Sequence, residues 1–377
     1  MGERERQDLI QQLEVARKSK VICYLTSLKP NVNAHMAEDA VRIFFDHLLK
    51  ISTKPIPQLD VYLCSNGGSG TVPWRLVSLF REYAKRFCVL VPYRAYSAAT
   101  LLALGADEIV MLPFSELGPI DPTVNGPFNP RDAAGQPQGI SVEDVTAYVT
   151  FIKSTVGITH EDELIEAIKI LATNVHPLAL GNIERFLSQS RMVARKILKT
   201  HMDDLDSHAM SEIVETMASK LYFHGHPINR KEALNDLHLK VVDVPANIED
   251  LMWRLYLSYE ASFGNRTVFD PAADLARDVV NQLNAAQAVA IQSPPGVPPS
   301  QTQIIAPAKL YRLLLAVIES AGMATHCNQS LRVQWTGATP PINVMNLGQD
   351  WADVDVEAEP SQASPLTTEV GAVPLHD

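Results

Sequence analysis

Strand-like and helix-like runs alternate between residue 19 and about residue 112, and this alternation restricts the folds open to the chain. Helically spaced apolar residues between the strand-like runs predict helices that can cover a sheet. We therefore expect an α/β domain of stacked ββα or βαβ units with a largely parallel sheet. The predicted strands are Val21–Leu25, Val61–Cys64, Cys88–Val91 and Glu108–Met111, and the predicted helix faces are Val41, Phe44, Phe45, Leu48 and Val72, Leu76, Phe80, Tyr83.

The middle of the chain changes pattern twice. Residues 113–140 are rich in Pro and Gly and predict a long irregular connection, the kind of segment that often carries function. Helical patterns follow, which predict a helical extension. They lie near 141–156, 161–173, 181–201 and 208–220, and a short helix near 227–233 leads to a strand-like run at 239–242. We expect this last unit to dock against the first.

The C-terminal third departs from the composition of the rest. No charged residue occurs from Val279 to Ala308, and Ser293 to Pro299 is Pro-rich, so residues 264–308 are predicted to be a linker after a domain at 1–263. Residues 309–332 are expected to form a short amphipathic helix. Residues 333–377 contain seven acidic residues and no Lys or Arg, and this composition predicts a largely disordered tail.

Charge and cysteine usage exclude some classes of function. A net charge of −11 and a pI near 5.5 exclude a nucleic-acid partner that is bound through its phosphates. Four cysteines without C-x-x-C spacing are expected to be reduced thiols. Because no stretch reaches the ~18 apolar residues of a membrane span, we expect no membrane insertion and a cytosolic location.

One serine stands where a hydroxyl can act as a nucleophile. Ser97 lies between a strand-like run and a helix-like run, and Gly67-Gly68 follows another predicted strand upstream, where backbone N–H groups could bind an oxyanion. Each feature also has an ordinary structural explanation, since serine often caps helices and a glycine pair often marks a turn. Together they suggest acyl transfer.

Several sequence blocks resemble the serine dehydrogenase proteinase family, over about residues 20–245. That family has the Clp protease and crotonase-like fold and is related to signal peptide peptidase A-type serine proteases. Related sequences usually have Pro at the position of Asn66, so the turn before the glycine pair lacks a fixed φ here. The blocks are residues 64–71 (CSNGGSGT), 96–100 (YSAAT), 104–111 (LGADEIVM), 117–122 (LGPIDP), 176–181 (HPLALG) and 222–233 (YFHGHPINRKEA).

The resemblance implies a site of acyl transfer. Ser97 Oγ would attack a carbonyl whose oxygen is held at the Gly67-Gly68 turn by the N–H groups of Gly68 and Ala98. The base is expected to be His224 or His226, which the sequence does not separate.

Clp proteases have a His where this chain has Asp121, so we expect exchanged positions in which Asp121 orients the imidazole. His176 is a further candidate base. Lys153 or Lys196 would serve a Ser-Lys dyad of the signal peptide peptidase kind.

The expected activity is a serine hydrolase that cleaves peptide or protein substrates. Two other functions stay open: a crotonase-type acyl-CoA enzyme that uses the same oxyanion site without Ser97, and a non-catalytic assembly module. The turn at Gly67 is not a G-x-G-x-x-G fingerprint, and no H-x-x-x-H or C-x-x-C constellation occurs, so no cofactor and no metal are expected. The resemblance further implies a ring-like homo-oligomer.

Overall fold

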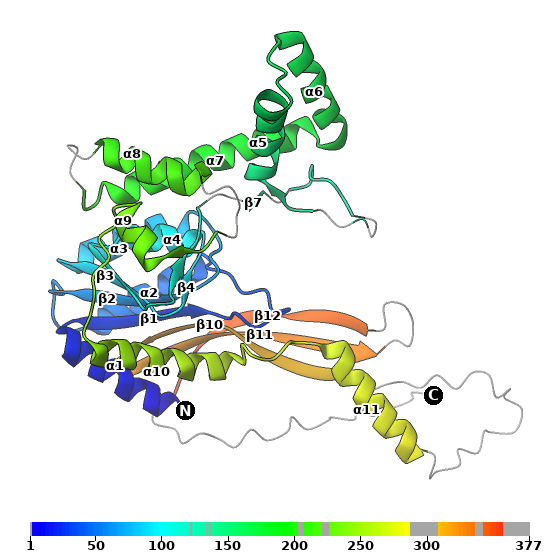
Figure 1. The fold of residues 1–377 in the computed structure, drawn as a ribbon. Coiled ribbons are helices and arrows are strands. Elements are labelled where there is room, and N and C mark those ends of the chain that lie inside the picture. Colours follow the sequence, from blue (N-terminus) through cyan, green and yellow to red (C-terminus); the bar gives the residue numbers. More distant parts are fainter. Residues whose placement is uncertain are drawn as a thin grey trace, which may run out of the picture.

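The molecule has a central β-sheet with helices on both faces (Figure 1). The computed structural model describes residues 2–120, 123–124, 126–132, 135, 138–202, 207–220, 226–286, 308–335 and 342–356. Within these segments, seven strands form one sheet in the order β12-β11-β10-β1-β2-β3-β5. The α/β architecture expected from the alternating sequence pattern is confirmed.

One half of the sheet is parallel and almost entirely buried. Its strands are almost continuously apolar, because both of their faces are covered by helices. Adjacent strands pair in parallel from β1 to β5, so their C-terminal ends share one edge. The bounds are β1 Lys20–Thr26, β2 Leu59–Cys64, β3 Phe87–Val91 and β5 Glu108–Met111.

Helices cover the two faces of this half separately. On one face, α1 and α10 bury Leu9, Ile10 and Tyr259 against the sheet; on the other, α2, α3 and α4 bury Phe44, Phe80 and their neighbours. The helical faces predicted from the sequence are the ones that pack. The bounds are α1 Glu3–Arg17, α2 Asp39–Lys50, α3 Val72–Tyr83, α4 Ala98–Ala103 and α10 Ala246–Phe263.

A small second sheet joins three distant parts of the chain beside α4. Its order is β4-β6-β9, with β4 parallel to β6 and β9 antiparallel to β6. The 239–242 run docks against the first unit as expected, since Val241 bridges Ile109 of β5. The bounds are β4 Arg94–Ala95, β6 Glu116–Leu117 and β9 Ile228–Asn229, and a separate two-stranded pair joins β7 Thr123–Val124 to β8 Ile140–Ser141.

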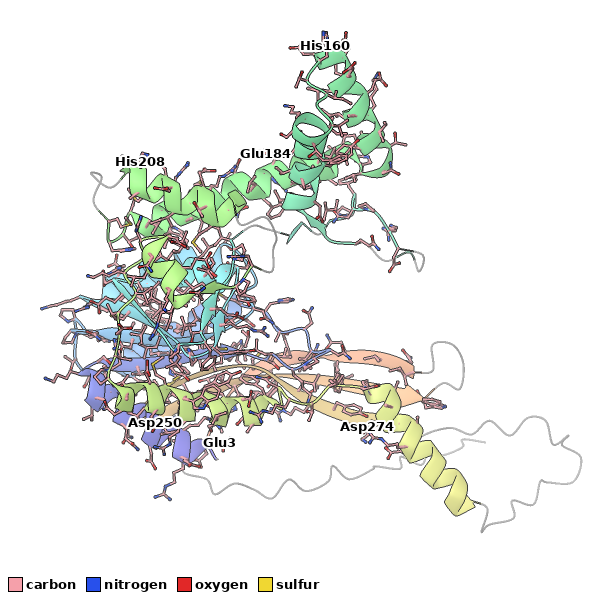
Figure 2. The ribbon with its side chains drawn as sticks, in the orientation of Figure 1. Glu3, His160, Glu184, His208, Asp250 and Asp274 are labelled. Atoms are coloured by element: carbon pink, nitrogen blue, oxygen red, sulfur yellow. The ribbon has the colours of Figure 1, made fainter. Side chains whose placement is uncertain are left out.

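The expected helical extension is also present. The helices α5 and α6 project away from the sheet, with His160 at their tip, while the long α7 runs back across the domain (Figure 2). No residue of α6 is buried, whereas α7 buries one side on the domain. The bounds are α5 Val142–Thr150, η1 Phe151–Thr155, α6 Glu161–Asn174, α7 Pro177–Leu198, α8 Ser207–Glu215, η3 Thr216–Lys220 and α9 Arg230–Asn235.

The C-terminal third differs from the prediction. The region 264–308, predicted to be a linker, contains helix α11 Pro271–Ala286. The segment 309–332, predicted to be a helix, forms β10 Lys309–Ser320 and most of β11 Met323–Trp335, and Ile342–Val354 of the predicted tail forms β12.

Burial of the C-terminal half of β10 explains why the sequence pattern wrongly predicted a helix there. The residues of β10 from Leu315 to Ser320 are buried, where the strand pairs antiparallel with β1. A strand covered on both faces shows no alternation of apolar and polar residues. Tyr311, Leu314, Leu315 and Ile318 therefore matched a helical spacing by chance.

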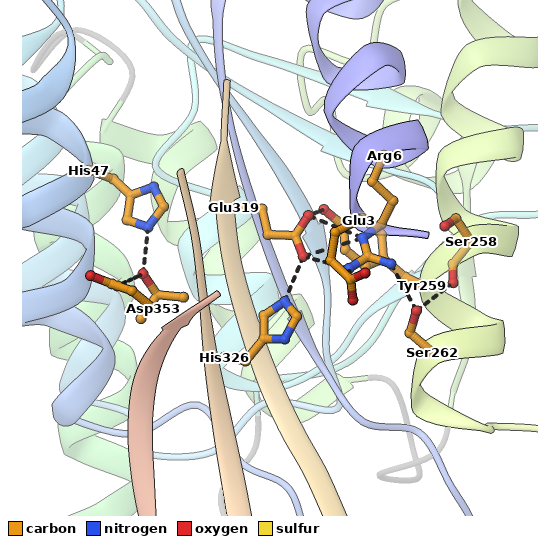
Figure 3. Close-up of polar contacts among 10 residues, drawn as sticks. Glu3, Arg6, His47, Ser258, Tyr259, Ser262, Glu319, His326 and Asp353 are labelled. Carbon is orange, nitrogen blue, oxygen red and sulfur yellow. Dashed lines mark hydrogen bonds and ion pairs between the residues drawn. The ribbon is translucent and has the colours of Figure 1, made fainter. Parts of the chain in front are cut away.

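A buried polar cluster ties the C-terminal strands to the N-terminal helix (Figure 3). The guanidinium of Arg6 donates to both carboxylate oxygens of Glu319, and Tyr259 Oη and His326 Nε2 donate to the same carboxylate at 3.0 and 2.8 Å. Arg6 and Glu319 are 1% and 0% exposed. Burial alone would raise the pKa of Glu319, but His326 and Arg6 hold it below its ordinary value.

Two general findings bear on the functional expectations. None of the helices in the described segments has both the length and the apolar character needed to cross a membrane. All four cysteines are free and buried, and burial raises the pKa of Cys64 to about 11. At neutral pH these thiols are therefore protonated and poor nucleophiles.

Candidate active site

Ser97 adopts a backbone conformation that L-residues rarely take. Its φ is 52° and its ψ is −115°, directly before the first residue of α4. Such a conformation costs on the order of 1–3 kcal/mol and persists where the surrounding structure imposes it. A strained serine between a strand and a helix is the arrangement of a nucleophile elbow, in which the turn exposes the hydroxyl.

The hydroxyl of Ser97 is not used as a helix cap. Its side chain accepts no hydrogen bond from the N–H groups of α4, and it has no hydrogen-bond partner among the described residues. The side chain is half-buried. The ordinary structural explanation for a serine at a helix start therefore does not apply here.

Hydrogen bonds around Ser97 impose the turn. Ser65 donates its N–H to the carbonyl of Arg94 at 3.1 Å and accepts the N–H of Tyr96 at 3.0 Å, which fixes the strand that leads to Ser97. On the other side, the buried hydroxyl of Thr100 lies 2.7 Å from the carbonyl of Ala95 and 2.9 Å from that of Gly118. The chain is thus held both before and after the serine.

The glycine pair packs directly against this turn. Gly67 has a φ of 95°, and a Cβ placed on it would lie 2.5 Å from the carbonyl oxygen of Tyr96, 2.9 Å from Ser97 Cβ and 3.0 Å from Ala98 N. Only glycine fits at so close an approach. The structure therefore brings together the two sequence motifs, which are separated by more than twenty residues.

Two backbone amides beside Ser97 are available to a ligand. Within the described residues, neither the N–H of Gly68 nor that of Ala98 donates to a protein acceptor. The N–H of Gly67, by contrast, donates to Ser65 Oγ at 3.0 Å. Of the three residues predicted for the oxyanion site, Gly68 and Ala98 keep unused donors, and Gly67 provides the close approach.

Buried hydroxyls hold the glycine turn that follows Asn66. Ser65 Oγ, which accepts the Gly67 amide, also accepts the hydroxyl proton of Thr26 at 2.8 Å. Both side chains are at most 1% exposed. The backbone of Met36 adds two bonds, since its N–H donates to Gly67 O at 2.7 Å and its carbonyl accepts the N–H of Ser69 at 2.8 Å.

The small sheet contains the strand that leads to Ser97 and the strand that follows His226. In the small sheet, Ala95 pairs with Leu117, and Leu117 pairs with Ile228. Ser97 follows the end of β4 by two residues and His226 precedes the start of β9 by two residues, and the pairing ends at Ala95 and Ile228. Asp121 and His224 lie outside the described residues.

The other candidate bases have structural contacts. His176 Nδ1 accepts the N–H of Leu178 at 3.1 Å as the N-cap of α7, and its ring stacks on Phe128 with centroids 4.9 Å apart. The ammonium of Lys196 lies 5.8 Å from the ring centroid of Trp74. Lys153 belongs to η1, a segment of the projecting extension with no buried residue.

A cavity with a perturbed histidine lies elsewhere. It has a volume of about 260 Å³, is lined by Leu104, Asp107 and His201, and lies at the C-terminal end of α4, whereas Ser97 precedes the N-terminal end. Burial, and after it the charge of Arg81, lowers the pKa of His201. In the described part of the chain, no group of three or more His, Cys, Asp or Glu side chains is arranged to hold a metal ion.

Two residues at the Ser97 turn and one contact of a candidate base were not found from the sequence. Ser65 and Thr100 are small hydroxyl residues next to apolar runs, and only their contacts reveal that they fix the turn. Glu232 accepts a hydrogen bond from His226 Nε2 at 2.8 Å. The spacing Asn229-x-x-Glu232 fits a capping box and could have drawn attention to this glutamate, although for a different role.

Comparison with known proteins gives distant similarity. No protein-family model matches the chain. An uncharacterized protein of Methanocaldococcus jannaschii is 22% identical over 205 residues, which are 54% of this chain. The aligned segment spans 59% of the length of that relative. Identity at this level, to a protein without a described activity, assigns no function.

Two solved structures show similarity at a lower level. A serine-to-alanine mutant of the membrane-bound stomatin-specific protease 1510-N has a TM-score of 0.36 at 14% identity, over 61% of this chain and 83% of that chain. Another mutant of that protease, in complex with a substrate peptide, has a TM-score of 0.35 at 15% identity, over 60% and 78%. At TM-scores below 0.5, neither structure supports a conclusion about this chain.

Proposed function

We propose that the chain is a serine hydrolase that cleaves peptide bonds through an acyl-enzyme on Ser97. One observation carries the proposal: a serine in a strained conformation, with a hydroxyl that caps no helix, lies against a glycine turn, and the N–H groups of Gly68 and Ala98 donate to no acceptor among the described residues. An α/β fold does not by itself require a strained serine beside unused backbone N–H groups. The choice of peptide bonds as substrate depends on the resemblance of the sequence blocks around residues 64–71 and 96–100.

In the proposed reaction, a base takes the Ser97 Oγ proton as the oxygen attacks the substrate carbonyl carbon. The π electrons of the carbonyl move to its oxygen, and the N–H groups of Gly68 and Ala98 stabilise the resulting oxyanion. Removal of one such donor costs about 3–4 kcal/mol in other acyl-transfer enzymes. The C–N bond then breaks, the leaving amine takes the proton from the base, and water hydrolyses the ester on Ser97 by the same route.

The base is proposed to be His226 or His224, with Asp121 as the orienting acid expected from the sequence. Support for His226 comes from its place just before β9, a strand of the same small sheet as β4, which leads to Ser97. A histidine is suited to this role because its ordinary pKa lies near neutrality. The contacts of His176 and Lys196 favour structural roles for those two residues.

A fluorophosphonate probe tests the nucleophile. We expect covalent labelling and peptide hydrolysis in the full chain, and loss of both in Ser97→Ala, with a fall in kcat of about 10⁴-fold or more. The matched control is Ser188→Ala, which removes an exposed hydroxyl that bonds only Glu184 on α7. This control should keep full labelling.

The Ser97→Ala experiment also distinguishes the proposed hydrolase from the two other candidate functions. Labelling that persists in Ser97→Ala contradicts the proposal. Turnover of a CoA thioester that survives Ser97→Ala would instead indicate a crotonase-type enzyme, which needs the oxyanion site but not the hydroxyl. No reaction with either reagent in the folded protein would favour an assembly role.

A further inference from the structure

The side chain of Tyr96, the residue directly before Ser97, reaches from the end of β4 to the neighbouring strand β6. These two strands pair in parallel, with Arg94 opposite Glu116. The hydroxyl of Tyr96 donates to the carboxylate of Glu116, the first residue of β6. The tip of the Tyr96 side chain is thus attached to a second strand.

The ring of Tyr96 lies against Gly118, just after β6. A Cβ placed on Gly118 would lie 2.7 Å from Tyr96 Cδ1 and 2.9 Å from Tyr96 Cγ. No larger residue fits at so close an approach unless the ring moves. The phenol is therefore fixed twice by one segment, through its hydroxyl at Glu116 and through its ring at Gly118.

The backbone of Tyr96 is held as well. Its N–H donates to the carbonyl of Ser65 at 3.0 Å, and its own carbonyl accepts the N–H of Ala99 at 2.9 Å. Ser97 follows with a φ of 52°, and a strained conformation of this kind persists only where the surrounding structure imposes it. Relaxation of Ser97 would rotate the peptide that it shares with Tyr96, and the anchored Tyr96 side chain opposes that rotation.

The hydrogen bond to Glu116 lasts across the neutral pH range. Burial, and after it the hydrogen bond to Glu116, raises the pKa of Tyr96 above its ordinary value. The phenol therefore stays protonated and continues to donate. A hydrogen bond to an ionised acceptor is also stronger than one between neutral groups.

We propose that Tyr96 is a positioning residue that keeps Ser97 in its strained turn. This inference rests on the proposed function. Glu116 and Gly118 fix the side chain of Tyr96, and the shared peptide transmits the constraint to Ser97. Because Tyr96 forms and breaks no bond in the reaction, its loss should slow the attack by Ser97 and leave substrate binding nearly unchanged.

Tyr96→Phe and Gly118→Ala test the two attachments separately. Tyr96→Phe removes only the hydroxyl, and we expect kcat to fall about tenfold at constant KM, with slower fluorophosphonate labelling of Ser97. Gly118→Ala puts a methyl group where the ring lies, and we expect a fall of about 10²-fold. Glu116→Gln should keep more of kcat than Glu116→Ala, because the amide oxygen still accepts the hydroxyl proton.

Tyr62→Phe is the matched control. It makes the same chemical change in the core on the other face of the sheet, where the Tyr62 hydroxyl donates to the carbonyl of Met252 at 2.6 Å. This variant should lower the thermal midpoint but keep kcat and the labelling rate. Equal losses of kcat in Tyr62→Phe and Tyr96→Phe would show that activity follows stability alone and would overturn the inference.

The labelling rates keep this inference distinct from the proposed function. If Ser97→Ala abolishes labelling while Tyr96→Phe and Gly118→Ala label as fast as the unmodified chain, the role of Tyr96 is overturned and the hydrolase proposal stands. Labelling that persists in Ser97→Ala removes the proposed function, and the role of Tyr96 with it. Slower labelling in Tyr96→Phe, with Tyr62→Phe unaffected, supports both.

Discussion

The turn around Ser97 and the cluster around Glu319 differ in whether their polar groups have hydrogen-bond partners. In the cluster, the Glu319 carboxylate is fully buried and is bonded by Arg6, Tyr259 and His326. At the turn, the Ser97 hydroxyl and the amides of Gly68 and Ala98 have no partner among the described residues. The two regions lie on opposite faces of the sheet.

This difference shows where function should be sought in the molecule. Perturbed pKa values often mark active sites, but ion-pair networks perturb them as well. Glu319 has a perturbed pKa, yet its carboxylate is already occupied and inaccessible, as expected of a group that stabilises the fold. The candidate active site is recognised by backbone strain and unused donors, neither of which involves a charge.

The largest expected effect that distinguishes the two regions is a loss of stability when the Glu319 cluster is broken. Glu319→Gln removes the buried counter-charge of Arg6 and leaves only the partly exposed carboxylate of Glu3 at 3.4 Å, and we expect it to lower the free energy of unfolding by about 3–5 kcal/mol. Urea unfolding measures this loss. Labelling of Ser97 in the folded fraction should be unchanged, because the cluster is on the other face of the sheet.

An exposed ion pair provides the control. Glu38 pairs with Arg75, and both side chains are about half exposed. Glu38→Gln should therefore change the free energy of unfolding by less than about 1 kcal/mol. Equal losses in the two variants would mean that the Arg6–Glu319 pair stabilises no more than a surface pair, and the contrast between the regions would fail.

The next largest expected effect is a pH dependence of stability that comes from His47. His47 is buried, with Nδ1 2.7 Å from Ser320 Oγ and Nε2 3.2 Å from Thr325 Oγ1, whose hydroxyl donates to Asp353 (Figure 3). Burial lowers the pKa of His47 from 6.5 to about 4, against the raising effects of Asp353, Glu319 and Asp46. The unfolded chain therefore binds a proton at a higher pH than the folded chain does.

The contribution of neutral His47 to the free energy of unfolding is fully present above pH 6.5. It is lost as the pH falls from 6.5 toward 4. The total loss is about 3 kcal/mol, from 1.36 kcal/mol per pKa unit. About 2 kcal/mol of this loss falls between pH 7.5 and 5, a window above the ordinary pKa values of carboxylates, and the free energy of unfolding measured across that window reports it. His47→Gln should reduce this dependence and leave the smaller part that comes from half-buried His201, and His35→Gln, at an exposed histidine, should not change it. A slope that is the same in all three proteins would show that another group titrates.

The sequence predicted those parts of the molecule in which local pattern and packing agree. The four parallel strands, the helices that cover them and the helical extension are read from short apolar runs and helical spacing. The strand β10 was missed because burial on both faces removes its alternation. At the site, Ser97 and the glycine turn have recognisable motifs, whereas Ser65 acts through a contact with Thr26 that is set only when distant segments pair.

The smallest expected effect tests whether buried hydroxyls replace the proline that is absent at Asn66. Ser65→Ala leaves the Gly67 amide and the Thr26 hydroxyl without their partner in a dry environment, which costs about 1–3 kcal/mol of stability. Because the same turn directs the Gly68 N–H, kcat should also fall about tenfold at constant KM. Thr26→Val removes only the outer hydroxyl and should affect kcat less. If Ser65→Ala lowers the unfolding free energy while kcat stays intact, the hydroxyls support the sheet but do not direct the oxyanion donor, and the strained turn alone is enough to place it.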